Sequence, residues 1–215
     1  MGDLALPGLR STASLHGRGD TVLVLGHGAG GNRRTPMLLS LAAAVAASGR
    51  AALLYNFPYA EKGTRRPDPP PLLESATRAA ARLAVETTGA RLVVHGGRSL
   101  GGRIASQAVA AGEPAAGLVL LAYPLHPPGK PERLRDAHLP RIAVPMLFVQ
   151  GTRDAFARED LLLRTLGALA PRAELVRVAD ADHSFGVLRR SGRTSADVLD
   201  EVTRALVGWL DRQGL

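Results

Sequence analysis

The sequence predicts an α/β fold in which a mostly parallel, twisted sheet is covered by helices on both faces. Short apolar runs of strand length alternate with longer helical patterns along the chain, which is typical of strand–helix–strand units. Most of these runs are uninterrupted Val, Leu and Ala, as expected of strands that are buried on both faces. A length of 215 residues, of which 46% are hydrophobic, suits one large core. We therefore expect a single domain over residues 1–215.

Six strands are expected where apolar runs are bounded by turn residues. They cover residues 21–25, 51–57, 91–95, 117–122, 145–150 and 173–178. The segment before Asp20 is weakly patterned and has room for one or two short, irregular strands.

Five helices are expected, over residues 36–48, 72–88, 99–111, 159–170 and 195–212. Thr35 is a suitable cap for the first helix, because Pro36 follows at the first helical position and Gly49 stands after the end. Gly89 ends the second helix in the same way.

Two connections are longer than an ordinary turn. Residues 58–71 (PYAEKGTRRPDPPP) are so rich in proline that we expect a stiff loop without helix. Residues 124–144 have room for one short helix at most. Neither connection is long enough for a cap domain, so no sizeable lid is expected.

The composition excludes several kinds of protein. There is no cysteine, which rules out disulfides, thiolate metal sites and cysteine catalysis. The net charge of +8 comes mostly from scattered arginines, aromatic residues make up 4%, and no nucleic-acid-binding motif is present, so nucleic acid is not an expected partner. Residues 1–10 lack the pattern of a signal peptide, and no apolar run reaches the ~18 residues that cross a bilayer. A cytoplasmic protein without a membrane partner is expected.

The segment Gly97-Arg98-Ser99-Leu100-Gly101 matches G-x-S-x-G, the sharp turn that exposes a nucleophilic serine between a strand and a helix. A buried-type strand precedes it and an Ala-rich amphipathic pattern follows it, which is the context that the motif requires. Ser99 is therefore the candidate nucleophile. The alternative is a tight turn in which the serine only caps the helix.

A nucleophilic serine needs a histidine base, and the base needs an acid that orients it. In folds with this motif the acid and the histidine follow the serine, each after a later strand. Asp154 follows the strand expected over 145–150, and His183 follows the strand expected over 173–178. They are the candidate acid and base for Ser99. The alternatives are an ordinary turn aspartate and a solvated loop histidine.

Other acids and histidines fit these roles less well. Asp180 and Asp182 are too close to His183 to be preferred as the acid, although either can orient its loop. The remaining histidines precede the nucleophile or follow no suitable strand: His16, His27, His95, His126 and His138.

A glycine-rich turn over residues 26–31 (GHGAGG) follows the first predicted strand. It resembles the turn that supplies one backbone N–H of an oxyanion hole, while the residue after the nucleophile supplies the other. We expect these donors to be Ala29, in preference to Gly28, and Leu100.

The same turn also matches a dinucleotide fingerprint through Gly26, Gly28 and Gly31. The rest of that pattern is missing: residues 55–57 (YNF) hold no acidic group for a ribose, and the helix starts too late to face a pyrophosphate. Motifs for a nucleotide phosphate or for zinc are also missing, so no metal or organic cofactor is expected.

Five arginines follow strand ends on the predicted catalytic edge and suggest that the substrate carries an anionic group. They are Arg33, Arg34, Arg65, Arg66 and Arg98. The alternative is a solvated basic rim, or pairing with nearby carboxylates at Glu61, Asp68 or Glu74.

Several segments together resemble a known family: HGAGG, YNFPY, GTRRPDPPP, GGRSLGGR, GTRDAF and ADHSF. They are similar to small α/β hydrolases related to dienelactone hydrolase, a group with bacterial members of unassigned substrate and eukaryotic testis-expressed and chromatin-complex members. The resemblance extends from about residue 22 to residue 209 and implies the α/β-hydrolase fold, with Ser99, Asp154 and His183 as a triad. Dienelactone hydrolase uses a cysteine nucleophile, which this chain lacks, so its substrate is not carried over.

These observations predict a serine hydrolase that cleaves an ester, thioester or related acyl bond of a small substrate through an acyl-enzyme at Ser99. An open site without a lid favours short and medium acyl groups. The alternative from another class is an interaction protein that keeps the fold without turnover, since some eukaryotic relatives act in complexes. The sequence leaves the natural acyl group, the leaving group and the oligomeric state open.

Overall fold

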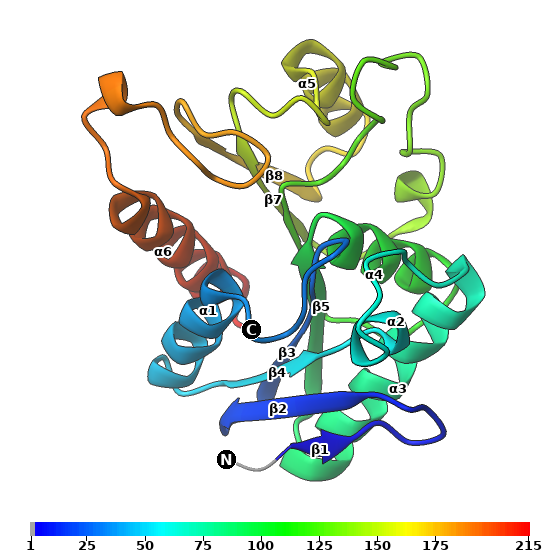
Figure 1. Cartoon of the computed structure of the whole chain (residues 1–215). Coiled ribbons are helices and arrows are strands. Elements are labelled where there is room, and N and C mark those ends of the chain that lie inside the picture. Colours follow the sequence, from blue (N-terminus) through cyan, green and yellow to red (C-terminus); the bar gives the residue numbers. More distant parts are fainter. Residues whose placement is uncertain (1–2) are drawn as a thin grey trace.

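The computed structural model describes residues 3–215, and its strands form an eight-stranded sheet in the order β1-β2-β4-β3-β5-β6-β7-β8. The six strands from β3 to β8 are parallel, and β1 and β2 add an antiparallel edge beside β4. The strands are β1 Leu4–Ala5, β2 Thr12–Gly17, β3 Thr21–Gly26, β4 Ala51–Tyr55, β5 Leu92–Arg98, β6 Gly117–Leu121, β7 Met146–Gly151 and β8 Ala173–Val178. The predicted parallel sheet is confirmed, as are the short strands expected before Asp20 (Figure 1).

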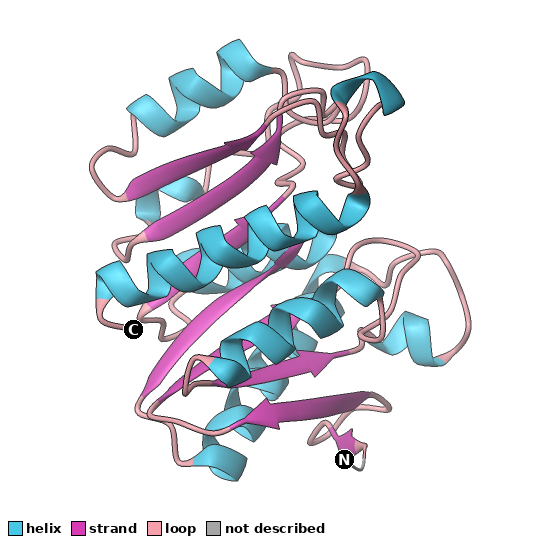
Figure 2. Ribbon diagram, turned by 90° about the vertical axis from the view of Figure 1, so that its left-hand side faces the viewer, coloured by secondary structure: helices cyan, strands magenta, loops and turns pink. Residues whose placement is uncertain are grey.

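The helices lie on both faces of the sheet (Figure 2). They are α1 Pro36–Ala47, α2 Pro58–Glu61, α3 Pro70–Thr88, α4 Leu100–Ala110, α5 Glu159–Gly167 and α6 Ser195–Gln213, with short 3₁₀ turns at Leu139–Arg141 and Arg189–Ser191. Helices α1 and α6 lie side by side on one face, while α3, α4 and α5 cover the other (Figure 1).

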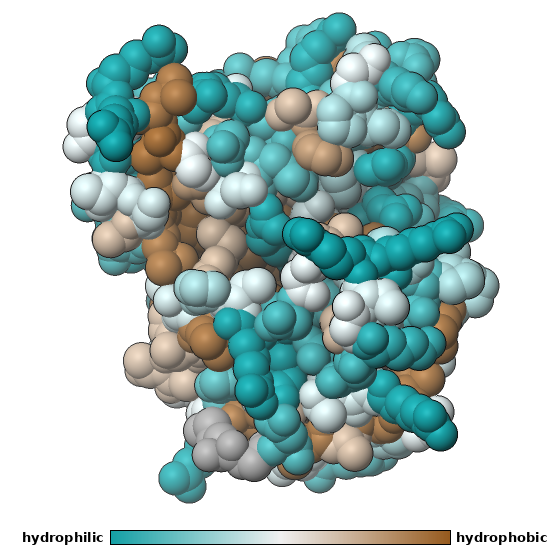
Figure 3. Space-filling view, viewed as in Figure 1, coloured by the Kyte–Doolittle hydropathy of each residue, from teal (hydrophilic) through white to brown (hydrophobic). Residues whose placement is uncertain are grey.

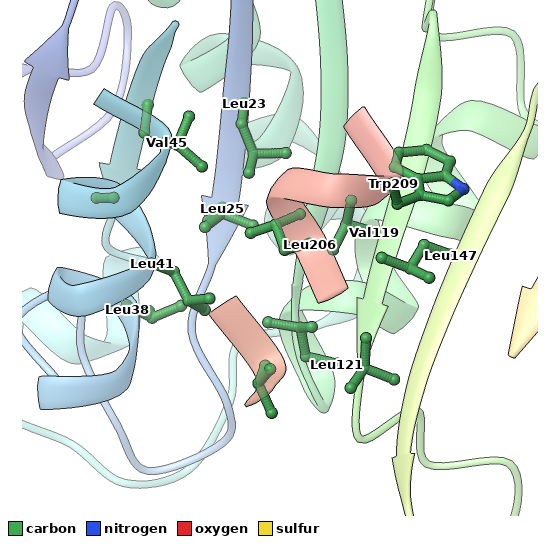
Figure 4. Close-up of a cluster of buried hydrophobic side chains, with 14 of the residues drawn as sticks. Leu23, Leu25, Leu38, Leu41, Val45, Val119, Leu121, Leu147, Leu206 and Trp209 are labelled. Carbon is green, nitrogen blue, oxygen red and sulfur yellow. The ribbon is translucent and has the colours of Figure 1, made fainter. Parts of the chain in front are cut away.

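Alternate residues of the central strands pack into two hydrophobic cores, one on each face of the sheet. Both faces are therefore apolar, which explains why the sequences of these strands are uninterrupted apolar runs. Leu23 and Leu25 of β3 face α1 and α6, where Leu206 and Trp209 pack (Figure 4). Val22 and Val24 face the opposite core beneath α3.

The proline-rich connection corrects one expectation. Residues 58–71 are not wholly loop, because α2 begins at Pro58 and α3 begins at Pro70, two residues earlier than expected. Proline is tolerated in the first turn of a helix, where its missing N–H would have no partner and its φ is already suitable. These prolines therefore start helices.

Two other helix ends differ from expectation. Thr35 occupies the N-cap position of α1, but its side chain makes no capping hydrogen bond. Among the helices, α6 has a reciprocal capping box, which Thr194 and Asp197 form at its N-terminus. Helix α5 ends at Gly167, three residues before the expected end at residue 170.

The connection between β6 and β7 contains one 3₁₀ turn at Leu139–Arg141, in agreement with the room predicted for a single short helix. Across residues 3–215 no segment folds over the sheet edge as a lid domain. No helix in this part of the chain is both long and apolar enough to cross a membrane.

The parallel strands place their carboxyl ends at one edge of the sheet, where ligands bind in open α/β folds. The loops that follow β3, β5, β7 and β8 therefore meet there. Those four loops carry the candidate residues from the sequence, except Arg65 and Arg66, which lie in the connection between β4 and α3.

Candidate active site

The turn between β5 and α4 holds Ser99 in an unusual backbone conformation, with φ +50° and ψ −110°. A β-carbon on Gly97 or Gly101 would overlap the carbonyl oxygen of Gly26. The flanking glycines are therefore needed for the close packing of this turn against β3. The Ser99 N–H donates to the carbonyl of Leu121 at 2.8 Å, which anchors the strained residue to β6.

The structure brings Ser99, His183 and Asp154 into one hydrogen-bonded chain. His183 Nε2 lies 2.9 Å from Ser99 Oγ, and His183 Nδ1 lies 2.7 Å from Asp154 Oδ2. An ionised carboxylate only accepts, so Nδ1 carries the proton and Nε2 is left to accept from the serine hydroxyl. The arrangement fits a nucleophile, a general base and an orienting acid.

The Asp154 side chain is fully buried and is held by two further donors. Gln150 Nε2 donates to its Oδ2 at 2.5 Å, and the Phe156 N–H donates to its Oδ1 at 2.7 Å. Gln150 also accepts from the N–H of Tyr123 at 2.8 Å, which links the acid to the loop after β6. Sequence reasoning missed Gln150, although one polar residue at the end of an apolar strand is a signal that it has a buried partner.

The loop that carries His183 is held by an aromatic contact to the imidazole and by hydrogen bonds within the turn that follows it. The ring of Phe156 stacks on it with centroids 4.1 Å apart and planes 25° apart. Asp182 Oδ1 accepts from the N–H groups of Ser184 and Gly186 at 2.8 and 2.9 Å. Of the two aspartates considered for orienting this loop, Asp182 therefore makes the contacts that shape the turn.

The backbone N–H groups of Ala29 and Leu100 are the donors that the sequence predicts for the oxyanion hole. Ala29 is exposed in the loop after β3, and Leu100 is the first residue of α4. Within residues 3–215 neither backbone N–H donates to a protein acceptor. Both amides therefore remain available to a ligand.

The loop after β3 is held by His27, whose side chain is fully buried. The N–H of Phe57 donates to its Nε2 at 3.1 Å, so Nδ1 carries the proton and donates to the carbonyl of Gly28 at 2.9 Å. Burial lowers the pKa of His27, which favours the neutral ring that these two bonds require. His27 connects the loop after β3 to the loop after β4.

His126 makes the same pair of contacts on the other side of the site. Its Nε2 accepts from the N–H of Arg158 at 2.9 Å, and its Nδ1 donates to the carbonyl of Pro127 at 2.9 Å. Its own N–H donates to the carbonyl of Phe156 at 2.9 Å. This buried histidine thus ties the loop after β6 to the segment that carries Asp154, a role that sequence reasoning missed.

The five arginines proposed from the sequence do not form one cluster. Arg98 Nη2 donates to the carbonyl of His183 at 3.0 Å and to Ser184 Oγ at 3.2 Å. A β-carbon on Gly28 would lie 2.8 Å from Arg98 Nη1, and one on Gly30 would lie 3.7 Å from Arg65 Nε. Two guanidinium groups therefore flank the loop over residues 28–30.

Arg33 corrects the prediction, because it is 4% exposed and points away from this loop. It pairs with Asp3 at 2.6 Å and donates to Thr12 Oγ1 at 3.2 Å, which ties the loop after β3 to the antiparallel edge of the sheet. Arg34 is exposed and also pairs with Asp3, at 3.1 Å. Arg66 is exposed in the connection after α2.

Arg98 is partly buried, and no carboxylate in residues 3–215 forms an ion pair with it. Burial lowers its pKa, an effect that the negative charges of Asp154 and Asp182 oppose. No group of three His, Asp or Glu side chains in this part of the chain is placed to hold a metal ion.

The fold is shared with solved structures of low sequence identity. An α/β serine hydrolase homologue from Coxiella burnetii is 21% identical, with a TM-score of 0.75 over 95% of this chain and 96% of that one. A serine hydrolase without a lid from Xanthomonas campestris is 19% identical, with a TM-score of 0.72 over 97% and 93%. Dienelactone hydrolase from Anabaena variabilis is 20% identical, with a TM-score of 0.76 over 98% and 95%.

Residues 19–211 match the model of the alpha/beta hydrolase domain family. The match spans the strands, helices and loops that position Ser99, Asp154 and His183. The chain therefore belongs to the α/β hydrolase domain family and has the α/β-hydrolase fold.

Proposed function

We propose that the protein is a serine hydrolase that cleaves an ester, thioester or related acyl bond of a small substrate through an acyl-enzyme at Ser99. The observation that carries the proposal is the continuous chain from Ser99 Oγ to His183 at 2.9 Å and from His183 to Asp154 at 2.7 Å. A buried acid, an oriented base and a serine at a strained turn are the parts that nucleophilic catalysis needs. The finer kinship, with the dienelactone-hydrolase-related group that uses serine, is part of this proposal.

The acylation step follows from these positions. Ser99 Oγ attacks the acyl carbon and gives its proton to His183 Nε2, while the carbonyl oxygen becomes negative. Collapse of this intermediate breaks the bond to the leaving oxygen or sulfur, which takes the proton from His183 and departs as an alcohol or thiol. The acyl group stays on Ser99.

Deacylation repeats the sequence with water. A water molecule gives a proton to His183 Nε2 and attacks the acyl carbon. The bond to Ser99 Oγ then breaks, and the proton returns from His183 to this oxygen. The carboxylic acid is released and the starting enzyme is restored.

The oxyanion of both intermediates would be stabilised by the N–H groups of Ala29 and Leu100. Both amides lack a protein acceptor within residues 3–215, which supports this assignment. Loss of one such donor typically costs about 3–4 kcal/mol of transition-state stabilisation. The rigid tie between His27 and Gly28 keeps the first donor's loop in place.

We expect Ser99 to be the only serine that a fluorophosphonate labels rapidly, and Ser99→Ala to reduce hydrolysis of an aryl ester by at least about a thousandfold. Ser106→Ala is the matched control, because its hydroxyl also contacts a histidine, His138, at 2.7 Å, but lies inside α4. Labelling and turnover should be near the wild-type level in the control. An unlabelled wild type without turnover would favour the interaction protein instead.

We further propose that the substrate is small and carries an anionic group near Arg98 and Arg65. The support is that both guanidinium groups flank residues 28–30 and that Arg98 is partly buried without a carboxylate partner. A cation in such a place attracts a carboxylate or phosphate more strongly than a fully solvated one does.

The test compares a neutral ester with a matched ester that carries a carboxylate on its acyl part. The wild type should prefer the charged ester, by kcat/KM, at least about threefold at low salt, and less at high salt. Arg65→Ala should reduce that preference, whereas Arg33→Ala, at the other side of the loop, should not. Equal kcat/KM for both esters in the wild type contradicts the anion site.

A further inference from the structure

A hollow of about 200 Å³ lies between the first turns of α1 and α6 and the turn that follows His183. Its apolar walls come from three separate elements: Pro36 and Met37 of α1, Phe185 and Gly186 of the turn, and Val198 and Leu199 of α6. In Figure 3 apolar surface gathers in this region, at the upper left, on a face that is largely hydrophilic.

Among residues 3–215, those that line this cavity carry no charged side chain, although 21% of the residues in the chain are charged. Ser184 and Ser195 are the polar residues at its rim. Such a lining favours an uncharged, apolar group over a carboxylate or an ammonium group. Ligand pockets for drug-sized molecules are about 300–1,000 Å³, so this cavity suits a smaller group.

The cavity adjoins the proposed catalytic base. Phe185 and Gly186 directly follow His183 and Ser184 in the chain, and Ser184 Oγ also accepts a hydrogen bond from Arg98. Arg98 in turn precedes Ser99. The cavity wall thus begins at Ser184, directly after His183 in the chain, and Ser184 is hydrogen-bonded to Arg98, the residue before the nucleophile.

The turn that forms one wall has an unusual backbone conformation that hydrogen bonds hold in place. Phe185 has φ +60°, a backbone conformation that is rare and strained for a bulky residue. The N–H groups of Ser184 and Gly186 both donate to Asp182 Oδ1, and these two hydrogen bonds hold this conformation. As a result the Phe185 side chain is 3% exposed and packs with Val198.

The position of His183 decides which half of the substrate the cavity receives. In acylation His183 Nε2 passes its proton to the leaving oxygen, so the leaving alcohol must lie on the His183 side of the acyl carbon. We propose that this cavity binds the alcohol part of the ester, an uncharged apolar group of about the size of a benzyl group. This inference rests on the proposed serine hydrolase activity.

The test uses two acetate esters whose alcohols are of similar acidity, ethyl acetate and benzyl acetate, together with ethyl phenylacetate, which carries its ring on the acyl side. Leu199 is half-buried at the cavity, so Leu199→Trp should fill it. We expect kcat/KM for benzyl acetate to fall about tenfold or more, the range that a change in an apolar pocket produces. Both ethyl esters should keep kcat/KM within about twofold of the wild type.

Leu163→Trp, at an exposed position of α5, is the matched control and should leave all three esters unchanged. Leu199→Ala provides the opposite change and should raise kcat/KM for 2-naphthylmethyl acetate relative to benzyl acetate at least about threefold. Normal turnover of ethyl acetate, with no selective effect of either Leu199 variant on the larger alcohols, would overturn the alcohol site while leaving the proposed function intact. Turnover of ethyl acetate by Ser99→Ala would overturn the proposed function itself.

Discussion

Three histidines around the site use their two ring nitrogens differently, and this difference separates their roles. His183 directs Nε2 to a hydroxyl that can give up its proton. His27 and His126 direct Nε2 to backbone N–H groups, which never give up theirs. In each of the latter two Nε2 is the acceptor of the hydrogen bond, so it is not a site that receives a proton from a nucleophile. They position loops on either side of the nucleophile.

His126→Leu should lower kcat by roughly ten- to a hundredfold with little change in KM, because it frees the segment that carries Asp154 and Phe156. It should also lower the free energy of unfolding by about 1–3 kcal/mol, since the Arg158 N–H loses its acceptor. Glutamine can place an oxygen near the position of Nε2. His126→Gln should therefore keep kcat within about threefold of the wild type.

These effects are measured by steady-state kinetics and urea unfolding. His16→Leu, in the antiparallel strand β2, serves as the control and should leave kcat unchanged. If His126→Leu and His126→Gln lose the same stability and the same activity, the hydrogen bond to Arg158 does not position the acid.

The residues that sequence reasoning found and those that it missed differ in kind. Ser99, Asp154 and His183 could be predicted because their order along the chain and their places after strands are local properties of the sequence. Gln150 and His126 act through contacts between loops that only the folded chain brings together. Arg33 was misplaced because its partner, Asp3, belongs to an edge strand region with a weak pattern.

At the scale of elements, β3 and α4 approach so closely that glycine alone fits between them. The carbonyl group of Gly26 occupies the space that a β-carbon on Gly101 would need. Since Gly101 is the second residue of α4, alanine there would favour the helix by its intrinsic propensity and yet collide with β3. At this residue helix propensity therefore favours alanine, whereas packing against β3 requires glycine.

Gly101→Ala should lower the free energy of unfolding by about 1–3 kcal/mol and slow fluorophosphonate labelling of Ser99, because β3 and the nucleophile turn must separate. Gly167→Ala is the matched control, since Gly167 is also helical and its β-carbon would meet no other atom. It should be neutral or stabilising by up to about 1 kcal/mol. If Gly101→Ala and Gly167→Ala are equally stable in urea titrations, the contact between β3 and α4 does not require glycine at residue 101.

The elements that could be predicted are those whose pattern is determined locally. Strands β3, β4, β6 and β7 could be identified because both of their faces are buried and their sequences are almost wholly apolar. The helical turn at Pro58 was missed because proline disfavours a helix everywhere except in its first turn, and the sequence does not show where a turn begins. Thr35 holds the N-cap position of α1 without making a capping hydrogen bond, a difference that depends on side-chain geometry and not on residue type.

For the molecule as a whole, several buried or half-buried histidines affect stability in the same direction. Burial is the largest cause that lowers the pKa of His16, His27, His95 and His138, in the last case to about 4. In the unfolded chain each histidine binds a proton near pH 6.5. The unfolded state therefore binds more protons than the folded state below that pH, and acid favours unfolding.

We expect the free energy of unfolding to fall steadily as the pH decreases from about 6.5 toward 4.5, and to change little between pH 7 and 8. Carboxyl groups with a lowered pKa, such as that of Asp197, act in the same direction but only in more acidic solution. His138→Gln should make the dependence on pH shallower in urea titrations. Unchanged or increasing stability between pH 6.5 and 4.5 would contradict the role given to these histidines.

The spacing of the site along the chain has a consequence for folding. Ser99 and His183 are 84 residues apart, and the strands that carry them, β5 and β8, are separated in the sheet by β6 and β7. Contacts between such distant segments form slowly, because a long loop must close first. During refolding the helices should therefore regain their circular dichroism before the protein regains its reaction with a fluorophosphonate. Reactivity at Ser99 would then report when the last strand has joined the sheet.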